Sequence, residues 1–151
     1  MQLAHELRSL HSAEGSLAAA LRAVGDGHAQ EIDIHHIADA LAQQCDARAD
    51  RLGPFADRYG DEEPSELDEP HRDLFGGVRS GPLGLLRDLN DLYLMACECE
   101  LAWTLVGQAA RGARDRELLD IVGRCEVETS TQVRWLRTRM KQAAPQALVV
   151  A

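Results

Sequence analysis

Aromatic side chains are scarce in this sequence of 151 residues: Phe, Trp and Tyr make up 4% of it, against 45% for hydrophobic residues as a whole. A hydrophobic content of that size is typical of globular chains and argues against disorder. With Ala and Leu abundant and aromatics few, the sequence favours a core of small and aliphatic side chains, as in a helical bundle. The length suits one core, so we expect residues 1–151 to form a single domain.

Basic residues are also few: the chain has 16 Lys and Arg and 25 Asp and Glu, which gives a formal net charge of −9. Nucleic acids and anionic membranes are bound by positively charged surfaces, so we expect neither as a partner. No apolar run approaches the ~18 residues that span a bilayer. The first residues, MQLAHELRSLHSAEG, lack the continuous apolar stretch of a secretion signal. We therefore expect a soluble, cytoplasmic protein.

The four cysteines lack the spacing of a disulfide framework, as expected for a protein of a reducing compartment. Cys97 and Cys99 do not form a zinc knuckle, since residues two apart on a helix point to nearly opposite sides. We interpret the cysteines as packing residues, because free cysteine behaves as a small hydrophobic side chain. An alternative is a thiol sensor at Cys97 or Cys99; it requires a lowered thiol pKa, which neighbouring negative charge opposes.

Apolar residues recur at spacings of three and four along four stretches of the chain, the period of helices that each bury one face. The predicted helices cover about residues 2–24, 30–59, 82–110 and 114–143. Proline inside a helix usually kinks it, so Pro54 predicts a bend in the second helix. The clearest repeat is that of the first helix, through Leu3, Leu7, Leu10, Leu17, Leu21 and Val24.

One long connection, about residues 60–81, separates the second predicted helix from the third, whereas the other two connections are short. A helix of ~30 residues is about 45 Å long, and ~22 extended residues reach roughly 70 Å. The connection can therefore run back along the whole bundle and make the second and third helices parallel. The predicted fold class is all-α: a four-helix bundle with one long crossover between helices 2 and 3.

Three carboxylates stand where the helical repeat calls for an inward, apolar residue: Glu14 in the first helix, Glu100 in the third and Glu128 in the fourth. Each lies near the middle of its helix, so the three are expected to meet at one level. A buried carboxylate is costly unless it is paired, protonated or bound to a metal. His11, three residues before Glu14, shares its helix face, and a His-x-x-Glu pair suits iron, manganese or zinc.

This arrangement resembles the ferritin-like superfamily, which includes ferritins, rubrerythrins and other di-iron carboxylate proteins. There, two helices each supply one Glu and the other two each supply a Glu-x-x-His motif. The resemblance implies that Glu14 and Glu100 correspond to the single glutamates and Glu128 to the motif of the fourth helix. The sequence departs from the family at Thr131, where the histidine would stand, and at residues 45–48, which read Cys-Asp-Ala-Arg.

Arg48 offers the carboxylates a partner other than a metal, because a guanidinium group is always charged and has five N–H donors. If it points inward, Arg48 holds two of the three glutamates in a structural ion network. We therefore favour a ferritin-like protein that has no resident cofactor and is not an enzyme. It would act by self-association, as a dimer or other homo-oligomer, or by binding a protein partner. The alternative is a protein that binds iron or manganese through Glu14, Glu100, Glu128 and His11, for iron storage or oxidative chemistry.

Overall fold

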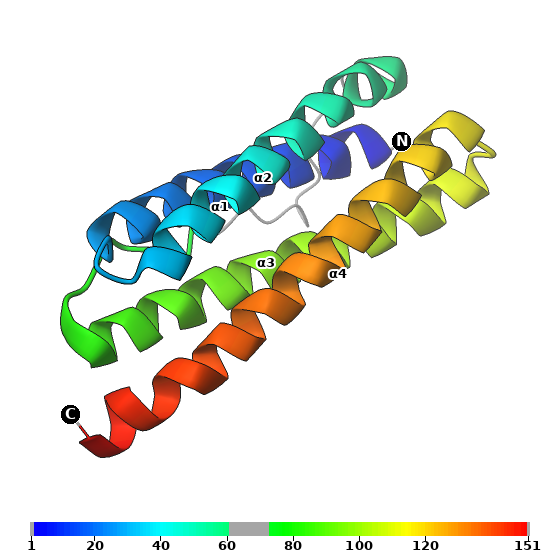
Figure 1. Ribbon diagram of the computed structural model, residues 1–151. Coiled ribbons are helices and arrows are strands. Elements are labelled where there is room, and N and C mark those ends of the chain that lie inside the picture. The colour runs from blue at the N-terminus through cyan, green and yellow to red at the C-terminus, as the bar shows by residue number, and fades with distance from the viewer. Residues whose placement is uncertain (1, 61–72, 151) are drawn as a thin grey trace.

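The computed structural model describes residues 2–60 and 73–150 and is all-α, as predicted. Four long helices are packed as a bundle, and a short π-helical turn follows the last (Figure 1). The predicted helix ends differ from the observed ones by a few residues. The elements are α1 (Leu3–Gly27), α2 (Ile32–Tyr59), α3 (Gly81–Gly112), α4 (Arg116–Pro145) and η1 (Gln146–Val150).

The four helices form two antiparallel hairpins, α1 with α2 and α3 with α4, and one long connection joins the two hairpins. In Figure 1, α2 and α3 run in the same direction, and α1 and α4 run in the opposite one. Residues 61–72 of the predicted crossover lie outside the described residues; residues 73–80 lead into α3 without regular secondary structure. The two hairpins meet mainly along α1 and α3, whereas α2 and α4 contact each other much less.

The core is aliphatic, and every leucine of the repeat predicted for the first helix is buried. Trp103 of α3 is the largest of the fully buried side chains. Helix α2 continues without interruption through Pro54, whose ring is exposed on the outer side. After Pro145 the chain makes one π-helical turn that buries Ala147 against the bundle.

Asp115 joins the end of α2 to the start of α4. One of its oxygens, Oδ1, accepts a hydrogen bond from the backbone N–H of Leu118 at 3.0 Å and caps α4. The other, Oδ2, accepts from Arg58 Nη1 at 2.8 Å and from the Tyr59 hydroxyl at 2.5 Å. Burial alone would raise the pKa of Asp115, but the hydrogen bonds from Tyr59, Leu118 and Arg58 outweigh it and lower that pKa.

We expect Asp115→Ala to reduce the free energy of unfolding by about 1–2 kcal/mol at pH 7, because α4 loses its cap. A lowered carboxylate pKa stabilises the fold above the pKa of the unfolded state, and this contribution is lost as the pH falls. The difference between the parent and Asp115→Ala should therefore shrink below about pH 4. Urea denaturation at pH 7 and pH 3 measures it. Glu117→Ala is the control, because it removes the exposed second partner of Arg58 and leaves the cap in place. If Glu117→Ala reduced the free energy of unfolding as much as Asp115→Ala, the role of the cap would be contradicted.

Candidate functional site

Arg48 brings a charged group from α2 into the middle of the bundle, where its side chain is completely buried. Its guanidinium binds Glu14 of α1 through two hydrogen bonds, from Nε to Oε1 at 2.9 Å and from Nη2 to Oε2 at 3.1 Å. From α4, Glu128 accepts a bond from Nη1 at 3.2 Å and Gln132 accepts one from Nη2 at 2.7 Å. Arg48 therefore links α1, α2 and α4.

Helix α3 joins the same group through Trp103, whose indole N–H donates to Glu14 Oε1 at 2.8 Å. Glu14, which is also completely buried, thus accepts three hydrogen bonds from charged and aromatic donors. We call the set formed by Glu14, Arg48, Trp103, Glu128 and Gln132 the Arg48 network. Each of the four helices contributes to it.

The charges of the Arg48 network are balanced at its solvent edge. The side chain of Glu128 is 32% exposed, and its second oxygen lies 3.9 Å from Arg51 Nη1. Two guanidinium groups thus face two carboxylates, Glu14 and Glu128. Burial on its own would lower the pKa of Arg48, but its hydrogen bonds to Glu14 and the negative charge of Glu14 raise that pKa. Arg48 is therefore a permanent cation in the core.

The thiols beside this network are protonated at neutral pH. Cys45 Sγ lies 3.2 Å from Arg48 Nη2, and burial together with the charge of Glu14 raises the pKa of Cys45 to about 12. Burial is also the main cause that raises the pKa of Cys99, followed by the charge of Glu14. The thiolate is the reactive form of cysteine, so the thiol-sensor alternative gains no support at Cys99.

Two of the four residues predicted to hold a metal, Glu14 and Glu128, meet in the Arg48 network. The other two, Glu100 and His11, are not among its members. Glu100 is half-buried, because the helical turn places the preceding residue, Cys99, in the buried position of α3. His11 is exposed on the outer side of α1. Within residues 2–60 and 73–150, no group of three or more His, Cys, Asp or Glu side chains is arranged to hold a metal ion.

Asp88 forms a second buried polar group, which the sequence analysis missed. Its side chain is completely buried in α3 and accepts a hydrogen bond from His28 Nε2 at 2.8 Å. It also accepts from the backbone N–H of Arg79 at 3.0 Å and from Arg79 Nη1 at 2.8 Å. Asp88 therefore fixes the segment before α3 to the end of α1. Its place among Leu85, Leu86, Leu89 and Leu92 is the signal that could have revealed it.

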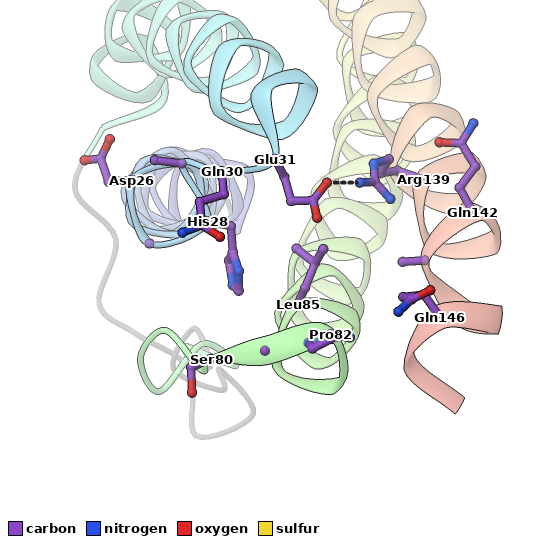
Figure 2. A pocket seen from close by; sticks show the side chains of 14 residues that line it. Asp26, His28, Gln30, Glu31, Ser80, Pro82, Leu85, Arg139, Gln142 and Gln146 are labelled. Atoms are coloured by element: carbon purple, nitrogen blue, oxygen red, sulfur yellow. Dashed lines mark hydrogen bonds and ion pairs between the residues drawn. The ribbon is translucent and has the colours of Figure 1, made fainter. Parts of the chain in front are cut away.

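A cavity of about 700 Å³ lies beside this second group, between the start of α2, the start of α3 and the end of α4 (Figure 2). Arg139 crosses it from α4, with Nη2 3.1 Å from Glu31 Oε2 and Nε 2.7 Å from Asp33 Oδ2. These contacts join α4 to the first turn of α2. The charged groups in this part of the cavity wall are thus paired with each other.

Comparison of the chain with protein-family models, with curated proteins and with solved structures gave no match. The architecture and the residues themselves therefore carry any assignment of function. None of the helices in the described part of the chain is both long and apolar enough to cross a membrane.

Proposed function

We propose that this chain is a ferritin-like helical bundle that acts by associating with other protein chains and not by redox catalysis. The observation that carries the proposal is the guanidinium group of Arg48 between Glu14 and Glu128. Residues 45–48 are the part of α2 where the ferritin-like resemblance would require a Glu-x-x-His motif. The positively charged guanidinium group of Arg48 occupies that position instead.

The Arg48 network does not fit a pair of metal ions. A divalent ion beside Glu14 would be repelled by the buried charge of Arg48 and would compete with the three N–H groups that Glu14 already binds. Redox-active ions in proteins also favour imidazole ligands, and no histidine belongs to this network. The chemistry of these side chains supports an ion network that holds the four helices together.

Association is supported by apolar side chains that point to solvent. On the outer side of α3, Leu94, Leu101 and Leu105 are 46%, 60% and 52% exposed. Apolar groups gathered on one exposed face are typical of protein interaction sites. The excess of acidic residues is in keeping with a protein partner and not with a nucleic acid.

The proposal predicts that the protein takes up well under one metal ion per chain. The measurement is elemental analysis of protein purified without a metal-binding tag, before and after aerobic incubation with ferrous iron, combined with oxygen consumption. Stoichiometric iron or manganese, or oxygen consumption faster than in buffer, would contradict the proposal and favour the metal-binding alternative. Glu100→Ala is the matched variant: ions bound through Glu100 should be lost with it, whereas nonspecifically bound ions should remain.

A further inference from the structure

We propose that α3 pairs with the α3 helix of a second copy of this chain, antiparallel, with a two-fold axis at Leu94. The inference deepens the proposed function, on which it rests, by naming the surface and the partner. The surface is the outer face of α3, marked by Leu83, Leu94, Leu101 and Leu105. We call it the leucine face.

The four leucines of the leucine face share one side of the helix, on which Arg87 and Asn90 also lie between Leu83 and Leu94. Leu83 and Leu94 are eleven residues apart, Leu94 and Leu101 seven, and Leu101 and Leu105 four. At 3.6 residues per turn these spacings are close to three, two and one whole turns, so the four side chains lie in one row. Their exposed fractions are 46%, 46%, 60% and 52%. Helix α3 also buries leucines on its inner side, so it carries leucines on both sides.

Three of the four leucines are placed symmetrically about Leu94, and this points to a second copy of the chain as their partner. Leu83 and Leu105 each lie eleven residues from Leu94. In an antiparallel pair centred on Leu94, Leu83 of one copy lies opposite Leu105 of the other, and the two Leu94 side chains meet. A two-fold interface requires such self-complementarity, whereas an unrelated partner does not.

The charged residues of the same face agree with this pairing. In this register Arg87 of one copy lies opposite Leu101 of the other and about one turn from Glu98, so that its aliphatic stem packs on the leucine and its charge approaches the carboxylate on both sides of the axis.

Analytical ultracentrifugation of the full chain tests the pairing. We expect the parent protein to sediment as a dimer, at twice the 16.6 kDa of one chain, at micromolar concentrations. Leu94→Asp places two carboxylates against each other at the axis and should weaken the dimer by about 100-fold. The control is Val127→Asp on α4, which introduces the same charge at a position that is 68% exposed and lines the groove beside Arg51 of α2. Circular dichroism of each variant checks that the helices are retained.

A disulfide tests the register directly. In a Cys97→Ser background, Leu94→Cys should form a disulfide between two copies on mild oxidation, because a residue on a two-fold axis faces its own counterpart. Val127→Cys in the same background should not. A monomeric parent, a dimer that resists Leu94→Asp, or a Leu94→Cys variant that does not cross-link would overturn the pairing of α3. The proposed function fails separately, through stoichiometric metal uptake, and that result leaves the ultracentrifugation result unchanged.

Discussion

Arg48→Ala should lower the free energy of unfolding by about 3–5 kcal/mol at pH 7, the range typical of removing one partner of a buried ion pair. The variant leaves the carboxylate of Glu14 buried, with Trp103 as the remaining donor of the Arg48 network. Gln132 also loses the donor that its side-chain oxygen binds at 2.7 Å. A loss of this size is a large share of the ~5–15 kcal/mol that stabilises a typical domain.

Urea denaturation followed by circular dichroism measures this loss, and two variants separate its causes. Arg51→Ala removes the half-exposed guanidinium at the solvent edge and should cost less than about 1 kcal/mol. Adding Glu14→Gln to Arg48→Ala removes the buried charge left without its partner, so the double variant should be more stable than Arg48→Ala alone. A variant Arg48→Ala that is as stable as the parent would contradict the structural role of the network.

Asp88→Ala should have the second largest effect, about 2–4 kcal/mol, because it removes the acceptor of three hydrogen bonds at a completely buried position. The imidazole of His28 and the backbone N–H of Arg79 would both lose the acceptor they now share. We also expect faster hydrogen exchange at the Arg79 amide, since this bond holds the segment before α3 against the bundle.

The matched control for Asp88→Ala is Asp91→Ala, one helical turn further along α3. Asp91 binds the same Arg79 guanidinium at 2.9 Å, but its side chain is 15% exposed and it does not contact His28 or the Arg79 amide in the described bonds. Its removal should cost less and leave the exchange of the Arg79 amide unchanged. Equal losses in the two variants would show that the Arg79 side chain, and not the buried acceptor, is what stabilises this end of the bundle.

The four helices could be predicted from the sequence because their apolar residues keep a clear helical period, with Glu14 as a visible interruption. The orientation of Glu100 could not be predicted with the same method. Helix α3 carries leucines on both its inner and outer sides, so its sequence defines the direction of the core poorly. Neighbouring residues of a helix point in directions 100° apart, so a small error in the direction of the core exchanges Cys99 and Glu100 as the inward residue. In the structure Cys99 is the buried one.

The contact between Asp88 and His28 could not be predicted from the helical period. It depends on how far α3 is shifted along α1, and the two residues are separated by 60 positions in the chain. The period of one helix defines which of its residues share a face, but not which residue of another helix lies beside them along the bundle axis. Asp88 was detectable as a charged residue on an apolar face, whereas its partner was not.

The contribution of every helix to the Arg48 network has a consequence for how the bundle assembles. Aliphatic side chains pack almost equally well when two helices slide past each other by one turn, about 5.4 Å. Hydrogen bonds do not tolerate such a shift, since they weaken steeply beyond ~3.5 Å. Glu14 and Arg48 lie within the first hairpin and pair there, while Trp103, Glu128 and Gln132 belong to the second. The two hairpins can therefore satisfy all these donors and acceptors at only one axial position relative to each other. The Arg48 network thus selects a single alignment among the many that the leucines alone would permit.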